Sequence, residues 1–250
     1  ETIRDLRAIC RAHGVPAEGA AERLLAHSPR MAAALAEEAP PAGFSAAPVA
    51  AQGTGIARHG GVALSPAFGV HPLRLVRALA DRAEAAGVRV CPRSEVTVWE
   101  RGGNAHRLHT PGGTVTADRV VLATNAFAPE ALAPELAGRA VPVITNIAVT
   151  RPLGADERAA HPWLGPDPAC DTRHLLAYLR LLPDGRLMLG MRGDLRGSEA
   201  GAAAMRRAVA RRIAAAFPGL GGIAIEAFWR GPVCMTAARR PAVGRLADAP

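Results

Sequence analysis

The spacing of hydrophobic positions changes along the chain and separates helical from extended segments. Between Val70 and Gly87 the apolar residues recur every three or four positions, which predicts a helix that begins at Pro72 and ends before Gly87. After this helix the spacing becomes short and alternating, with glycine-rich turns between the runs. We therefore expect a strand and then a small antiparallel meander, at residues 88–90, 94–100, 106–110 and 114–117.

A buried strand is expected directly after the meander. The apolar run at residues 120–123 stops at the small polar tripeptide Thr124, Asn125 and Ala126. A short apolar run that ends in this way is typical of a buried parallel strand, and open α/β sheets bind ligands at the carboxyl ends of such strands. An ordinary strand end with no ligand is the plain alternative.

The second half of the chain predicts a mostly antiparallel sheet with one inserted helix. The helix is expected over residues 198–217, and residues 183–185, Pro-Asp-Gly, predict a tight hairpin. Extended segments are expected at residues 141–150, 172–180, 186–192 and 223–229. At the start of the chain we expect helices over residues 2–13 and 20–37, and then a loop over residues 40–61. The predicted fold class is therefore mixed, α+β or α/β.

Composition adds little to this picture, although the formal net charge is +8. All of the 30 basic side chains other than histidine are arginines. The densest cluster is interpreted as the solvated face of a helix, and no aromatic residues alternate with it for base stacking. Its members are Arg206, Arg207, Arg211 and Arg212. We therefore expect no nucleic-acid partner.

The 4 cysteines are widely separated, which argues against a zinc site and against a disulfide scaffold. We expect no bound metal and a cytoplasmic location. His106 and His109 are interpreted as surface histidines, and no apolar run reaches the length of a membrane span.

The ordered set of motifs resembles the FAD-dependent amine and amino-acid oxidoreductases of the D-amino-acid oxidase superfamily, in the branch of glycine, sarcosine and γ-glutamylputrescine oxidases. The segments that carry the resemblance include GGTVTADRVVLATNAF, AYLRLLPDGRLMLG and FWRGPVCMTAARRPAVGRL. The resemblance implies an FAD-binding domain at residues 60–135 and 236–250, with a parallel sheet and a β-meander. It implies a substrate domain at residues 1–59 and 136–235. FAD is the expected cofactor, and an amine or amino acid is the expected substrate.

The glycine-rich turn with which this family begins is not found in the sequence. The segment with Gly53 and Gly55 has no third glycine and follows no predicted strand, so it is interpreted as a loop. We therefore expect a fragment without the N-terminal dinucleotide-binding unit and the C-terminal end, and weak FAD binding by the chain as given. A truncated, non-catalytic remnant that binds no cofactor is the alternative.

Two side chains are the candidates for substrate binding. Tyr178 and Arg180 alternate on one predicted strand, so both face the same side of the sheet. In the family that sheet roofs the substrate site, which would place the phenol and the guanidinium beside a substrate carboxylate. A core tyrosine beside a structural arginine is the alternative.

Further candidates for the cofactor site come from the resemblance alone. It implies that the backbone at Val96 meets the adenine ring and that residues 124–126 lie near the ribose and diphosphate. Cys234 stands in a Gly-x-x-Cys-Met segment, the form in which some members attach flavin covalently, and a buried inert cysteine is the alternative. The last candidates are Arg239 and Arg240, near the flavin ring, and His71, which otherwise caps a helix. The oligomeric state stays open.

Overall fold

The computed structural model describes residues 2–102, 105–127, 130–194, 197–236 and 243–246. The chain divides into two compact units, each described here by itself. Unit 1 is Glu1–Arg82 with Ile144–Gly231, and unit 2 is Ala83–Val143 with Pro232–Pro250. Residues 60–82, which we expected in an FAD-binding domain, are grouped with unit 1. The functional roles of the two parts stay predictions.

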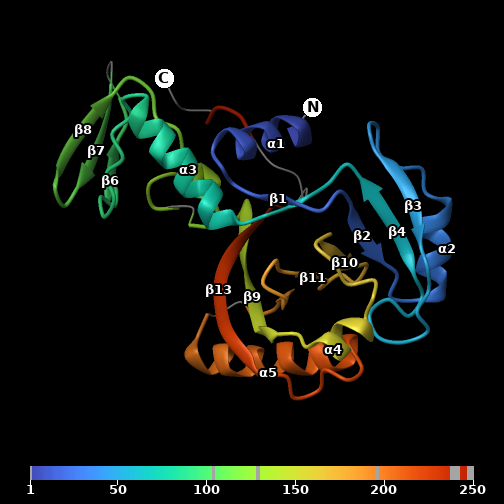
Figure 1. The fold of residues 1–250 in the computed structure, drawn as a ribbon. Coiled ribbons are helices and arrows are strands. Elements are labelled where there is room, and N and C mark those ends of the chain that lie inside the picture. Colours follow the sequence, from blue (N-terminus) through green and yellow to red (C-terminus); the bar gives the residue numbers. More distant parts are fainter. Residues whose placement is uncertain (1, 103–104, 128–129, 195–196, 237–242, 247–250) are drawn as a thin grey trace. The chain divides into compact units, whose positions relative to one another are not determined.

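Unit 1 is built on an eight-stranded sheet (Figure 1), in the order β13-β9-β12-β11-β10-β2-β4-β3. Strands β2 and β10 run parallel, whereas β10–β11, β11–β12, β12–β9, β2–β4 and β3–β4 are antiparallel pairs. The strands are β2 Glu22–Leu25, β3 Ser45–Val49, β4 Gly61–Ser65, β9 Ala140–Pro152, β10 Ala169–Asp171, β11 Ala177–Leu181, β12 Arg186–Arg192 and β13 Ile225–Thr236. The mixed α+β class expected from the sequence is confirmed.

The described residues also form five α-helices and a short two-stranded ribbon. The helices are α1 Thr2–Ala12, α2 Pro29–Glu37, α3 Pro72–Ala85, α4 Ala155–Ala159 and α5 Glu199–Ala216. Ser28 and Ser198 cap α2 and α5 through their side-chain oxygens, which accept from the backbone N–H of Met31 and Gly201. The ribbon pairs β1 Ala17–Glu18 with β5 Gly69–Val70 in antiparallel register.

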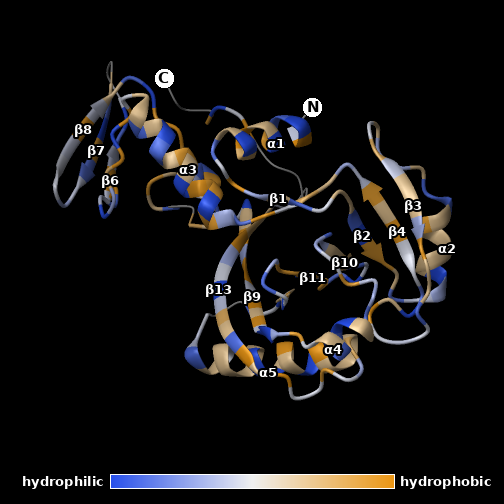
Figure 2. Cartoon of the chain, in the orientation of Figure 1, coloured by the Kyte–Doolittle hydropathy of each residue, from blue (hydrophilic) through white to orange (hydrophobic). Residues whose placement is uncertain are grey.

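The core of unit 1 forms where one face of the sheet meets α5. Leu179, Leu187 and Leu189 are buried on β11 and β12, and they belong to one cluster with Val209, Ile213 and Phe217 of the helical segment. Hydrophobic colouring is also strong on β2 and β4 (Figure 2). Leu25 of β2 belongs to the same cluster, whereas Val62 of β4 is buried in a separate small cluster on the other side of the sheet. Alternate positions on each strand supply this face, as the period of a β-strand requires.

Unit 2 contains the expected meander of β6 Val98–Glu100, β7 His106–Thr110 and β8 Gly113–Ala117. Trp99 donates from its indole N–H to His106 Nδ1 at 3.3 Å, and the guanidinium carbon of Arg101 lies 3.8 Å from the indole centroid. Arg101 also pairs with Glu135, which lies in the short 3₁₀ helix at Pro134–Leu136. These contacts order one side of the meander.

The two predicted parallel strands of the cofactor domain are absent from the described structure. Residues 88–90 and 120–123 adopt no strand, and Val121 is 86% exposed. A strand exists only where a neighbour accepts and donates its ladder hydrogen bonds, and no described segment pairs with either of them. The prediction of parallel strands at these two places is therefore wrong for the part of the chain that the structure describes.

Two expectations for the N-terminal region are also wrong. The first part of the predicted helix at residues 20–37 is strand β2, and the predicted loop at residues 40–61 contains strand β3. Alanine-rich composition suggested a helix, but pairing with β10 and β4 decides the conformation of β2. Strand β3 lies at the edge of the sheet, where Pro48 costs no ladder bond on the open side.

The stability of unit 1 depends on the leucines between the sheet and α5. Leu189→Ala should lower the free energy of unfolding by about 2–5 kcal/mol, because it leaves a cavity in a fully buried site. Urea unfolding of the full-length protein, followed by circular dichroism, measures this loss. Leu73→Ala is the matched control, since Leu73 is 52% exposed, and equal losses for the two variants would contradict the assignment of the core.

Candidate active site

The side of the sheet that faces away from the leucine core carries the two predicted substrate residues. Leu179 pairs with Leu189 across β11 and β12, and both belong to the core. Tyr178 and Arg180 occupy the alternate positions of β11, so they share the opposite face. The predicted common orientation of these two side chains thus follows from the observed register. Their role toward a substrate stays a prediction.

Tyr178 lies across a gap in this face that a glycine creates. Gly190 of β12 stands opposite Tyr178, and a Cβ at Gly190 would overlap the phenol ring. Because that Cβ is missing, the ring extends over β12 to β9, where its hydroxyl lies 2.5 Å from Thr145 Oγ1. Either hydroxyl can donate in this pair. The half-buried phenol is therefore held in one orientation and keeps hydrogen-bonding capacity for a further partner.

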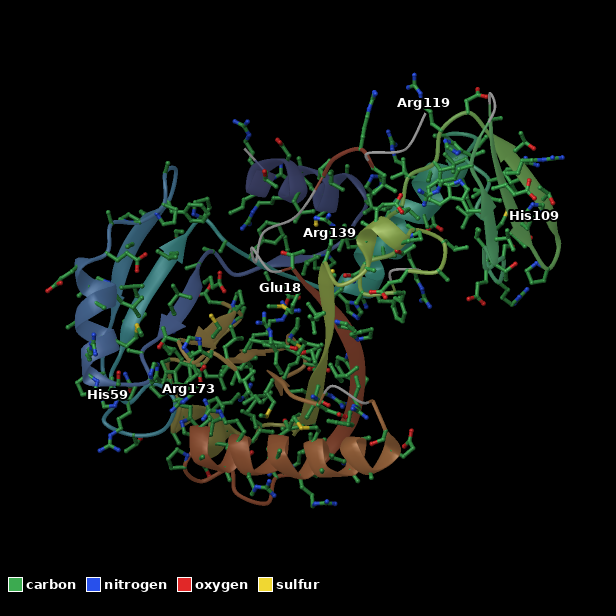
Figure 3. The ribbon with its side chains drawn as sticks, turned by 180° about the vertical axis from the view of Figure 1, so that it is seen from behind. Glu18, His59, His109, Arg119, Arg139 and Arg173 are labelled. Carbon is green, nitrogen blue, oxygen red and sulfur yellow. The ribbon has the colours of Figure 1, made fainter. Side chains whose placement is uncertain are left out.

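Arg180 is more deeply enclosed than Tyr178, with 7% of its surface exposed. Its Nη1 donates to Glu18 Oε2 and its Nη2 donates to the Val70 carbonyl oxygen, each at 3.2 Å. Glu18 lies on β1, where Figure 3 labels it, and Val70 lies on β5. The guanidinium thus fastens the β1–β5 ribbon to the sheet. This arrangement agrees with the alternative in which Arg180 is a structural arginine. The Glu18 carboxylate balances its charge.

A buried polar network lies on the opposite, leucine side of the sheet and was missed in the sequence. Asn146 of β9 is fully buried, donates to the Gly193 carbonyl at 2.9 Å and accepts from Arg230 Nε at 3.1 Å. Arg230 also forms an ion pair with Asp194. A buried amide requires such partners. The asparagine within an apolar strand pattern, at residues 143–149, is the one feature that could have indicated it.

The four cysteines are unpaired in the structure. Burial, and next to it the Glu22 carboxylate, raises the pKa of the Cys170 thiol to about 12. That thiol is therefore neutral near pH 7 and is a poor nucleophile, because thiolates are the reactive form. Cys234 lies half-buried on β13, in unit 2.

The predicted cofactor residues lie in both units. Thr124, Asn125 and Ala126 form an exposed turn of unit 2, with Asn125 at φ 52° and the Phe127 N–H donating to the Thr124 carbonyl at 3.0 Å. Val96 precedes β6 and is half-buried. The hydroxyl, the amide and the backbone N–H groups of this turn are the donors that ribose and phosphate oxygens require. The hydrogen-bond donors of this turn therefore fit the nucleotide part of FAD.

The three remaining candidates have different outcomes. His71 of unit 1 directly precedes α3, where its Nδ1 accepts from the Arg74 backbone N–H at 3.4 Å and its carbonyl accepts from Leu75. These contacts are those of a helix cap, the alternative named for His71. Arg239 and Arg240 lie outside the described residues.

Comparison with known proteins identifies the family. The family model described as FAD dependent oxidoreductase matches residues 2–250. The chain belongs to the FAD-dependent oxidoreductase family. It is 34% identical over 179 residues to γ-glutamylputrescine oxidoreductase of Escherichia coli (strain K12), an alignment that covers 71% of this chain and 41% of the relative. It is 32% identical over 178 residues to a probable oxidoreductase of Rhizobium meliloti (strain 1021), covering 69% of this chain and 39% of that protein.

Solved structures share the fold of this chain at low sequence identity. L-proline dehydrogenase from P. horikoshii superimposes with a TM-score of 0.74 at 17% identity, over 98% of this chain and 68% of that one. Glycine oxidase from Geobacillus kaustophilus gives a TM-score of 0.72 at 20% identity, over 99% of this chain and 67% of the enzyme. The family's cofactor is FAD, as the sequence predicted. The chain spans about two fifths of the length of its curated relatives.

Neither a metal cluster nor a membrane span is found in the described part of the chain. No group of three or more His, Cys, Asp or Glu side chains there could hold a metal ion. No helix within the same residues is long and apolar enough to cross a membrane.

The packing of Tyr178 over Gly190 can be tested by a double-mutant cycle. Gly190→Ala should destabilise the protein by about 1–3 kcal/mol, because the new methyl group displaces the phenol ring. In a Tyr178→Ala background the same substitution should cost much less, since the ring is gone. Urea midpoints of the four proteins measure the coupling, and additive effects would show that the ring does not lie over Gly190.

Proposed function

We propose that the protein represented by this chain oxidises an amine or amino acid with FAD, and that the substrate lies against the Tyr178 face of the eight-stranded sheet. The family match over residues 2–250 supports the reaction class. The proposed substrate location rests on the difference between the two faces of the sheet. The leucine face is covered by α5, while the opposite face presents the phenol of Tyr178, held by Thr145. FAD, when bound, accepts a hydride from the carbon next to the substrate nitrogen.

Tyr178 and Arg180 orient the substrate in this proposal. Thr145 fixes the Tyr178 hydroxyl, so the phenol can hydrogen-bond a substrate with little loss of side-chain entropy. Arg180 has more N–H donors than its two contacts to Glu18 and Val70 use, so it can also pair with a substrate carboxylate. The ion pair with Glu18 then sets the position of the guanidinium before the substrate arrives.

The cofactor site is proposed on the residues that the family resemblance indicated. The backbone at Val96 meets the adenine, and Thr124, Asn125 and Ala126 lie near the ribose and diphosphate. Arg239 and Arg240 lie near the flavin ring, where positive charge stabilises the reduced flavin. Cys234 is either the covalent attachment point or an inert side chain.

The expected domains and location belong to the same proposal. Residues 60–135 and 236–250 serve FAD, and residues 1–59 and 136–235 serve the substrate. The four unpaired cysteines support a reducing compartment, the cytoplasm.

Substrate recognition can be tested in the full-length protein with two conservative variants. Arg180→Lys keeps the charge but loses the planar fork, so the binding of carboxylate substrates should weaken by about 1–3 kcal/mol. Tyr178→Phe should likewise raise KM, because the hydroxyl is removed while the packing over Gly190 is kept. Flavin reduction by a panel of amino acids and of amines without a carboxylate measures both effects.

Arg211→Lys is the control variant for this test, since Arg211 is exposed on α5, the helix that covers the other face of the sheet. Unchanged turnover of every substrate in Tyr178→Phe and Arg180→Lys would refute the assigned face while leaving the family intact. Full-length protein that is purified without flavin and does not take up added FAD would instead support the non-catalytic alternative.

A further inference from the structure

A cavity opens in unit 1, and neither the proposed substrate face nor the expected cofactor residues contribute to it. Its volume is about 220 Å³, whereas a water molecule needs only about 10–15 Å³ on the same measure. It is lined by Ala26, His27, Gly55, Ile56, Arg58, His59, Arg173, Arg212, Ala215 and Ala216. The lining is therefore basic on one part and apolar on the rest.

The topology of the sheet brings these residues together. Strands β2 and β10 run parallel, so their carboxyl ends lie at the same edge. His27 follows the end of β2, and Arg173 follows the end of β10. Figure 3 shows His59 and Arg173 at the same end of unit 1. Ligands of sheet proteins bind preferentially outside the carboxyl ends of parallel strands, where the following loops diverge.

Positive charge exceeds negative charge around this cavity. Asp171 is 2% exposed, and its Oδ2 accepts from Arg173 at 2.7 Å and also from Arg212. Its Oδ1 accepts from the backbone N–H groups of Arg173 and Ala177. One carboxylate thus balances only one of these two guanidinium groups. Arg58 also lines the cavity and forms no ion pair with any described residue, so a formal excess of two positive charges remains.

The loop that carries Arg58 and His59 is fixed in place before any ligand binds. Ile56 donates from its backbone N–H to the Ala216 carbonyl at the end of α5, at 3.0 Å. Gly55 has φ 59°, and a Cβ there would overlap the same carbonyl. Gly60, at the end of the loop, accepts from the Ala26 N–H at 2.9 Å. A site built on such a loop loses little entropy on binding.

The cavity lies on the α5 side of the sheet, because Asp171 contacts Arg212 of that helix. Cys170, its neighbour, pairs in register with Tyr178. Adjacent residues of a strand point to opposite faces, so the sheet separates this cavity from the Tyr178 face. The inference is consequently independent of the proposed function.

We propose that this cavity binds a phosphate group. Guanidinium groups match the oxygens of phosphate in a fork geometry, and three of them converge here from distant parts of the chain. The walls formed by Ala26, Ile56 and Ala215 leave apolar space beside the charged groups, which suits the carbon skeleton of a small organic phosphate.

Isothermal titration of the full-length protein with inorganic phosphate and with glycerol 3-phosphate tests the proposal at constant ionic strength. Both probes should bind in chloride buffer, whereas glycerol should not. Tighter binding of glycerol 3-phosphate would identify an organic phosphate as the ligand, and equal affinities would identify free phosphate. Failure of both probes to bind at millimolar concentration would overturn the proposal.

Arg58→Gln should weaken the binding of both probes by about tenfold, the scale of one lost charged hydrogen bond. Arg211→Gln is the matched control, because it removes one arginine of α5 that does not line the cavity. Ala215→Phe should abolish binding by filling the cavity without a change of charge. Equal affinities in Arg58→Gln, Arg211→Gln and the unchanged protein would place the phosphate elsewhere. Urea midpoints verify that each variant is folded.

Discussion

The strict alternation of side chains on β11 and β12 is the constraint on which unit 1 depends. Each strand gives every second residue to the leucine face, and the burial of Leu179 and Leu189 there fixes the register. A slip of one residue would bury Tyr178 and Arg180 against α5 and expose the leucines. The position of the candidate site is therefore set by hydrophobic burial on the other side of the sheet, and its own hydrogen bonds only refine it.

This dependence explains why the common side of Tyr178 and Arg180 was predictable and their partners were not. Alternation is a local property, so the sequence of β11 sufficed. Glu18 lies 162 residues from Arg180 in the chain, in a ribbon of two-residue strands that produces no hydrophobic period. Gly190 was read only as part of a strand motif, although its missing side chain gives the Tyr178 ring its space. Contacts of this kind depend on tertiary pairing.

The same distinction separates the predictions that were confirmed from those that were wrong. Helices α3 and α5, the β7–β8 hairpin and strand β12 were found because helical period, caps and turns are encoded locally. Residues 120–123 have an equally clear apolar run, but a parallel strand also needs neighbours, and no described segment supplies them. Strand β2 is the converse case: it begins a segment whose alanine-rich composition predicted a helix, and its pairing with β10 and β4 makes it a strand.

The positions of the arginines also depend on tertiary structure. The arginines at residues 206–212 form a cluster in the sequence, yet the helix separates them: Arg207 and Arg211 are exposed, while Arg212 turns to the buried Asp171. Arg212 lies on the side of α5 that includes Val209 and Ile213, which packing holds against the sheet. The parallel ends of β2 and β10 then bring it to the same cavity as Arg58 and Arg173. Basic residues that are adjacent in sequence are thus dispersed. Arg58 and Arg173, more than a hundred positions apart, converge because strand order places the loops that carry them side by side.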